Sequence, residues 1–242
     1  MMDPEEFKTM SGGELMRMEL PRQQFCIEGI LPRGLSILTC TKEDAARGLA
    51  LDVSLCVSAG QMLWGSKVQQ GPVLHMIHSD ALFVTRNRLM ELTKRVPDEL
   101  YVGVMTEAAL ELAESALPSF VEAHPSASMV VVELDSPVAY TDEKLYVAGE
   151  ALIHYSRLKE MAAQYGLAVL IVQRSVGSKY SLDLSSVDDA ACISDVIEAH
   201  FELCPDSYHR NEAALKRSSR VYGNAAWEIV HAAKSYRWEL KK

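Results

Sequence analysis

Short apolar runs alternate with helix-like segments along most of the chain, and this alternation constrains the fold more than any other feature. Five continuous apolar runs have the length of a strand: Leu35–Cys40, Val73–Ile77, Tyr101–Met105, Met129–Leu134 and Leu167–Gln173. Strands that are apolar on both faces are typical of a parallel sheet covered on both sides by helices. We therefore predict an α/β fold with a doubly wound, mostly parallel sheet.

Helix-like segments follow these strands. In Glu43–Ala59 the apolar residues recur at the spacing of one helix face, and Gly60 is a typical helix stop. Three further helices are predicted on the same grounds: Ala81–Arg95, Ala108–Ala123 and Glu143–Tyr165. A helix between each pair of strands indicates that the strands run parallel.

The last part of the chain has a different pattern, in which strand-like stretches follow one another directly. These stretches are Val196–Cys204, Leu215–Val221, Trp227–Ala233 and Arg237–Leu240. Gly223–Asn224 is a hairpin-turn signal between two of them. We expect one domain over residues 1–242, with a lead-in segment 1–33, an α/β core 34–195 and antiparallel strands over 196–242 that extend one sheet edge.

Charge and hydrophobicity limit the partners that the chain can have. The formal net charge is −9, from 24 basic and 33 acidic residues, and residues 201–242 alone are net basic. An acidic body is a poor general polyanion binder, so the net charge does not support DNA as a partner, although a local basic face could contact phosphate. The apolar runs are far shorter than the roughly 20 residues of a membrane span. We expect a cytoplasmic protein with no membrane partner.

Cysteine and histidine spacing gives no support for a metal site. The five cysteines include no CxxC pair, so we expect reduced, mostly buried thiols: Cys26, Cys40, Cys56, Cys192 and Cys204. His75 and His78 lie three residues apart on a predicted strand, where alternation directs them to opposite faces. No metal ligand set is therefore predicted.

Several short stretches, spread over nearly the whole chain, resemble one protein family. They are Glu28–Leu38, Leu49–Val53 with Ala59–Gly60, Gly71–Leu74, Tyr165–Val172 and Tyr236–Leu240. In this order they resemble the first core strand, the helix after the phosphate loop, the second strand, the sensor strand and the closing strand of the RepA-like branch of the RecA-type P-loop ATPases. The resemblance implies a RecA-like sheet and surfaces shaped for contact between subunits, because these ATPases place residues of one subunit against the nucleotide of the next.

The first strand-to-helix turn departs from that family. A phosphate loop has the pattern GxxxxGK[ST]: the glycines let backbone N–H groups wrap phosphate, the lysine supplies charge and the hydroxyl binds Mg²⁺. The corresponding residues here are Cys40 and Ala45 at the glycine positions, Ala46 at the lysine position and Arg47 at the hydroxyl position. All four signature positions are lost, so we expect no phosphate cradle.

The residues within this turn also oppose a phosphate. Glu43 and Asp44 begin the following helix, whose N-terminus would otherwise attract an anion. Thr41 with Asp44 fits a capping box, which predicts that the chain fills this anion site with its own side chains. Partial compensation for the lost lysine by Lys42 or Arg47 is an open alternative.

Two acidic positions of the family site fall on identifiable residues. The resemblance places the water-activating glutamate of the RepA-like enzymes at Ser79, which Asp80 follows. The strand Met129–Leu134 carries Glu133 near its end, with Asp135 two residues later. Either acid could hold Mg²⁺ through water as in a working enzyme, and either could be an ordinary strand exit.

The sensor strand ends in two residues with more than one interpretation. Gln173 stands at the sensor position, and the following Arg174 is either a remnant phosphate contact or a solvated, ion-paired arginine. Ser175–Asp189 has the composition of a solvated loop, in a region that in RepA-like proteins lies toward the ring interior or the neighbouring subunit. Its serines lack the nucleophile-elbow pattern, so acyl-transfer chemistry has no support.

A basic set near the C-terminal strands has two interpretations. Lys216, Arg217 and Arg220 could contact DNA phosphate or an acidic neighbouring subunit. They could equally form the solvated face of an edge hairpin, where Lys and Arg discourage further strand pairing. Both interpretations are kept.

The sequence favours a protein without catalysis over an enzyme. We expect no catalytic residue and no cofactor, and an assembly or regulatory component in replication or mobile-element DNA metabolism. Its expected partner is a second copy or a related RecA-like subunit, through apolar residues near loops and element ends: Leu63, Trp64, Phe83, Phe120 and Trp238. The alternative is a divergent ATPase or helicase-like enzyme that binds MgATP through a remodelled loop.

Overall fold

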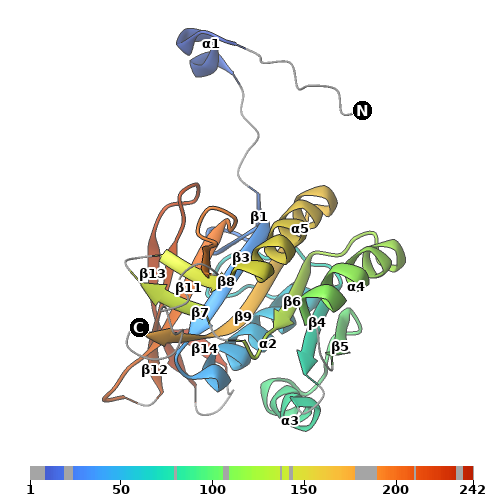
Figure 1. The fold of residues 1–242 in the computed structure, drawn as a ribbon. Helices are drawn as coiled ribbons and strands as arrows, with labels where there is room; N and C mark the ends of the chain where they lie inside the picture. The colour runs from blue at the N-terminus through green and yellow to red at the C-terminus, as the bar shows by residue number, and fades with distance from the viewer. Residues whose placement is uncertain are drawn as a thin grey trace.

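Six parallel strands form the larger part of a mixed sheet with helices on both faces (Figure 1). They lie side by side in the order β5, β4, β6, β9, β3, β11. Their bounds are β3 Gly34–Cys40, β4 Val73–His78, β5 Leu100–Met105, β6 Met129–Glu133, β9 Ala168–Gly177 and β11 Ala199–Pro205. The structure is a computed structural model that describes residues 9–18, 24–78, 81–105, 109–136, 138–141, 144–177, 190–209, 211–232 and 237–241. The predicted α/β class with a mostly parallel sheet is confirmed.

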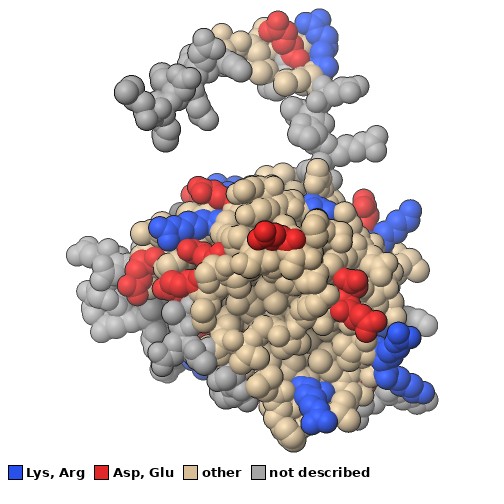
Figure 2. Space-filling model, turned by 90° about the vertical axis from the view of Figure 1, so that its right-hand side faces the viewer, with Lys and Arg blue, Asp and Glu red and all other residues tan. Residues whose placement is uncertain are grey.

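Three antiparallel strands continue the sheet beyond β11. They are β12 Glu212–Ser218, β13 Ala225–His231 and β14 Trp238–Leu240. The predicted C-terminal antiparallel extension is confirmed for β12, β13 and β14, although β12 begins at Glu212 rather than at Leu215. It is wrong for the first predicted strand, Val196–Cys204, because β11 pairs parallel with β3 and belongs to the parallel part of the sheet. In this run of strands β5 and β14 lie at opposite ends, and Figure 2 looks onto the side of the molecule where β5 lies.

Two hydrophobic cores lie on opposite faces of the sheet, because strand side chains alternate between the two faces. In β3, Leu38 packs into the core beneath α2, whereas Ile37 packs into the core beneath α4 and α5. The helix bounds are α2 Glu43–Ala59, α3 Leu82–Leu92, α4 Ala109–Ala123 and α5 Gly149–Tyr165. Because both faces of the parallel strands are buried, their sequences are continuous apolar runs.

The predicted glycine stops are present in the structure. Gly60 follows α2 with φ of 66°, and Gly166 follows α5 with φ of 64°. Both N–H groups return to carbonyls of the last helical turn. Glycine takes this left-handed conformation without the Cβ penalty of other residues, so the sequence locates both helix ends.

The N-terminal region contains three short elements that the sequence analysis does not predict. Helix α1 Gly12–Arg17 stands apart from the body of the protein (Figure 1). Strands β1 Phe25–Ile27 and β2 Leu31–Pro32 form a separate two-stranded sheet. Within the described ranges, no helix is both long enough and apolar enough to span a bilayer.

The helix predicted from Glu143 is wrong at its start. A hairpin precedes it, formed by β7 Val138–Thr141 and β8 Lys144–Ala148, and β10 Ala190–Cys192 pairs with β8. In β8 the buried residues Leu145 and Val147 alternate with less buried ones, which is a period of two rather than a helical period. Helix α5 therefore begins only at Gly149.

Strand β9 is also longer than predicted, since it continues to Gly177 and pairs there with β7. The first three residues of the expected loop Ser175–Asp189 therefore belong to a strand. Residues 178–189 lie outside the described residues. The five cysteines are free, and Cys26, Cys40 and Cys56 are buried as expected.

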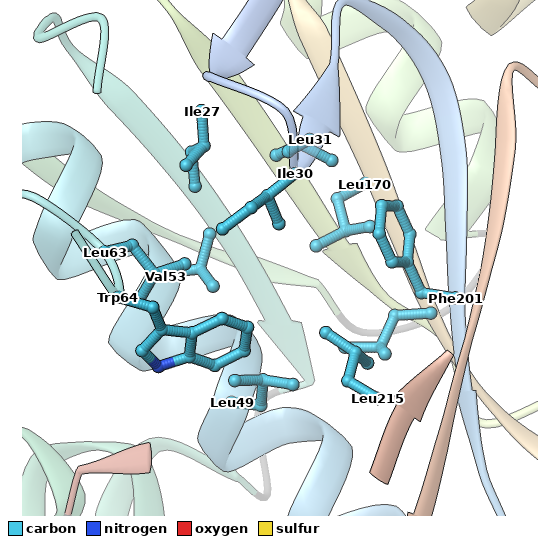
Figure 3. Close-up of a pocket in the computed structure, with 11 residues that line it drawn as sticks. Ile27, Ile30, Leu31, Leu49, Val53, Leu63, Trp64, Leu170, Phe201 and Leu215 are labelled. Carbon is cyan, nitrogen blue, oxygen red and sulfur yellow. The ribbon is translucent and has the colours of Figure 1, made fainter. Parts of the chain in front are cut away.

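An apolar cavity of about 30 Å³ lies in the core beneath α2 (Figure 3). It is lined by apolar residues only: Ile27, Ile30, Leu31, Leu38, Leu49, Val53, Leu63, Trp64, Leu170, Phe201 and Leu215. Trp64 has a positive φ of 51°, which is unfavourable for a bulky residue, and its indole N–H donates to the Trp238 carbonyl at 2.7 Å. We interpret the cavity as packing space within the core.

A buried ion pair attaches the last strand to α2. Asp52 is 1% exposed, and its carboxylate accepts from Arg237 Nε at 2.6 Å and from the Trp238 backbone N–H at 3.2 Å. Burial raises the pKa of Asp52, and Arg237 opposes that rise. The ionised carboxylate thus depends on its partner across the fold.

We predict that Arg237→Ala lowers the free energy of unfolding by about 3 kcal/mol, since it leaves the Asp52 carboxylate buried without a counter-charge. Urea denaturation at neutral pH measures the loss. The matched control is Arg95→Ala, because Arg95 is 88% exposed and pairs with the exposed Asp98. Equal small losses for the two variants would contradict a stabilising role of the Asp52–Arg237 pair.

Candidate functional site

The carboxyl ends of four adjacent parallel strands meet at one edge of the sheet, where open α/β sheets bind their ligands. In spatial order these strands are β4, β6, β9 and β3. The register places Gln173 beside Thr39, and Val172 beside Glu133. This edge brings the turn after β3, the acids after β6 and the sensor position together.

The turn after β3 is packed as an ordinary strand-to-helix connection. Cys40 is fully buried, and its sulfur accepts the Lys42 N–H at 3.3 Å. Ala46, at the position of the family lysine, is also fully buried in the core. Neither side chain can therefore take the role of the family residue at its position, since both are packed into the core.

The predicted capping box is not formed. The N-cap of α2 is Lys42, which makes no side-chain hydrogen bond to the helix, so Thr41 lies one residue too early. The Asp44 carboxylate instead accepts from Arg88 of α3 at 2.8 Å. A cation on a neighbouring helix therefore outcompetes the local backbone for this acid.

Arg47 is the centre of the site. Its Nη2 lies 2.5 Å from Asp135 Oδ1, and its Nε lies 3.3 Å from Glu133 Oε2. Glu133 is 3% exposed, and its Oε2 has no hydrogen bond within the described residues, so attraction between charges holds this contact. A single guanidinium thus bridges the two acids that follow β6.

The second oxygen of Glu133 is held by a histidine that the sequence analysis considered only as a metal ligand. His75 Nε2 lies 3.0 Å from Glu133 Oε1, and His75 Nδ1 lies 2.8 Å from the Ser54 hydroxyl on α2. The Ser54 hydroxyl also donates to the Ala50 carbonyl at 2.9 Å, so His75 is held between α2 and the acid after β6. This contact could have been predicted only from the pairing of β4 with β6, which puts His75 beside Val131.

Asp135 and Gln173 are also held by side chains or backbone of neighbouring elements. His78 Nε2 lies 3.2 Å from Asp135 Oδ2. Gln173 donates to the Ser136 carbonyl at 3.0 Å and accepts from the Tyr155 hydroxyl at 2.6 Å. Gln173 therefore holds the backbone next to Asp135, whereas the following Arg174 is exposed.

This arrangement restricts the chemistry of the site. Mg²⁺ needs carboxylate oxygens that are free to hold it or its water, but here the guanidinium of Arg47 lies between both acids. The residues present therefore do not fit a Mg²⁺–phosphate group at these positions. Ser79 and Asp80, at the place of the water-activating glutamate, lie outside the described residues.

Two solvent-accessible cavities flank the ion-pair network. One of about 440 Å³ lies beside the start of α2 and is lined among others by Lys42, Arg88 and Trp238. The other, of about 360 Å³, is lined among others by His78 and Asp135. The first carries acidic and basic side chains, so it has no single charge sign that would select an anion or a cation. The second has two histidines and three carboxylates in its lining, with no lysine or arginine, so it does not suit an anion such as phosphate.

The basic set on the C-terminal strands divides into different environments. Arg217 is 6% exposed and donates to backbone carbonyls, among them Gly29 at 2.7 Å and Tyr222 at 2.9 Å. Arg220 is exposed and forms an ion pair with Asp195, and Lys216 is exposed. Arg217 thus links β12 to the N-terminal hairpin, and only the other two present their charge to solvent.

No protein-family model matches the chain, and no curated protein matches it significantly. In the part of the chain that the structure describes, no group of three His, Cys, Asp or Glu side chains is arranged to hold a metal ion.

A buried histidine lies next to the site on β11. His200 Nε2 is 2.8 Å from the Thr39 hydroxyl, and burial lowers the pKa of His200 to about 4. Because the folded-state pKa lies below the unfolded value, the native state favours neutral imidazole. The resulting stability is present above about pH 6.5 and is lost as the pH falls toward 4.

We predict that acid destabilises the native protein partly through this histidine. Between pH 7 and 4 the wild type should lose about 3 kcal/mol more unfolding free energy than His200→Gln, which has no imidazole to protonate. Urea unfolding at several pH values measures the difference. His209→Gln is the control, since it removes a histidine that is 65% exposed. A His200→Gln slope equal to that of the wild type would contradict the assignment.

We predict strong coupling between Arg47 and Glu133. Arg47→Met should cost about 3 kcal/mol by leaving Glu133 buried without its cation, and the Arg47→Met/Glu133→Gln double variant should be less destabilised than the sum of the single variants by at least about 1 kcal/mol. Urea denaturation of all four proteins gives this coupling energy. Arg174→Met, on the neighbouring strand, is the exposed control and should change little. Additive single variants would show that the pair carries no stability.

Proposed function

We propose that this chain is a RecA-type, RepA-like ATPase fold that no longer hydrolyses ATP and acts as an assembly or regulatory component in replication or mobile-element DNA metabolism. The strand arrangement supports the fold. The strand before the degenerate loop, β3, lies inside the sheet and α2 follows it; β9, which carries the sensor position, lies next to β3, and β6, which carries the acidic positions, lies on the far side of β9.

The observation that carries the proposal is the position of Arg47. A guanidinium replaces the Mg²⁺-binding hydroxyl and reaches the two acids that would hold the metal in a working enzyme. The cation that pairs with these acids is thus a residue of the chain itself. The acids are therefore paired without Mg²⁺ and without a bound nucleotide.

One observation favours the alternative, a divergent ATPase with a remodelled loop. The N-terminus of α2 has no side-chain cap at Lys42, and a cavity of about 440 Å³ lies beside it. Free N–H groups at a helix start attract anions. Under this alternative Lys42 would replace the lost lysine, from outside the core.

Thermal unfolding with and without MgATP tests the proposal. We predict no shift in Tm and no Mg²⁺-dependent ATP turnover, because the acids are already paired; a ligand at 100 times its Kd would add about 2.7 kcal/mol. The Lys42→Ala variant distinguishes the alternative, with the exposed Lys67→Ala as its control. A MgATP-dependent rise in Tm that Lys42→Ala removes and Lys67→Ala keeps would establish the remodelled loop. Turnover abolished by Glu133→Gln would overturn the proposal.

A further inference from the structure

One end of the large sheet is an open, apolar strand edge. Among the described residues β5 pairs with β4 alone, so one side of Leu100–Met105 has backbone N–H and C=O groups without strand partners. Its sequence, LYVGVM, contains neither a charged residue nor proline. Natural sheets usually protect such an edge with charge, proline, a bulge or a very short strand.

The other ends of the same sheet are protected in this way. β14 is three residues long, contains Glu239 and is followed by Lys241. β10 is also only three residues long. β5 has six residues and therefore differs from both. This difference indicates that a partner strand covers its edge.

The side chains around β5 are suited to burial. Val102 and Val104 are 39% and 50% exposed on the same strand face. Figure 2 shows that the middle of this side of the molecule carries few charged side chains. By contrast, Leu63 and Trp238, which the sequence suggested for an interface, are buried in the core.

We propose that β5 pairs with β5 of a second copy of this chain, in antiparallel orientation about a twofold axis. This inference rests on the proposed role in assembly and names its interface. An identical strand is self-complementary in this orientation, since a twofold axis at Gly103 places Val102 opposite the partner's Val104. No charge lies on the strand, so the pairing brings no like charges together. The result is one sheet that runs through both subunits.

Sedimentation velocity on the full chain at micromolar concentration tests this pairing. We expect a mass twice that of the chain for the wild type and for Val104→Ile. Val104→Lys should have the mass of a single chain, because each copy then brings a charged lysine into the paired strands. The control is Ile153→Lys, which places the same charge at a residue of similar exposure, 57%, on α5, and it should remain a dimer.

Hydrogen exchange provides the second measurement, since it does not depend on the folding of a variant. Amides of residues 100–105 should become at least about tenfold better protected as wild-type concentration rises through the dimerisation range. A monomeric wild type, or an oligomer that Val104→Lys leaves intact and in which residues 100–105 gain no protection, would overturn the β5 interface. In the second case another surface, such as residues 9–18 of a neighbour, would hold the assembly. The nucleotide test above is independent of both outcomes, so the two proposals fail separately.

Discussion

The contact of one guanidinium with two carboxylates organises the edge of the sheet where a ligand would otherwise sit. Arg47 extends from the second turn of α2 to Glu133 at the end of β6 and to Asp135 beyond it, and each acid has a histidine on its other side. Removing the guanidinium would leave a carboxylate that is 3% exposed without a charge partner, which is among the costliest changes in a protein interior. The loop after β3, the end of β4 and the end of β6 are therefore fixed by one set of charges.

Much of this architecture can be predicted from sequence because its causes are local. Apolar runs of strand length and the helical spacing of Glu43–Ala59 depend on neighbouring residues, and so do the stops at Gly60 and Gly166. The start of α5 was missed because Leu145 and Val147 alternate with polar or aromatic residues over a stretch too short to separate from a helical pattern.

The site was predictable only in part. The lost glycines, lysine and hydroxyl are visible in Cys40–Arg47, and so is the acid at Glu133. The partners of Arg47 were not, since they come from a strand far along the chain, and only the sheet order brings them together. Asp44 shows the same limit: its local pattern indicated a helix cap, but Arg88 of another helix takes its carboxylate.

A crystal structure grown with a non-hydrolysable MgATP analogue and sulfate tests the central claim most directly. The account predicts that Arg47 still bridges Glu133 and Asp135, and that no anion lies on the backbone N–H groups of residues 42–47. Phosphate or sulfate held by these N–H groups, with Arg47 withdrawn from the acids and Mg²⁺ in its place, would contradict it.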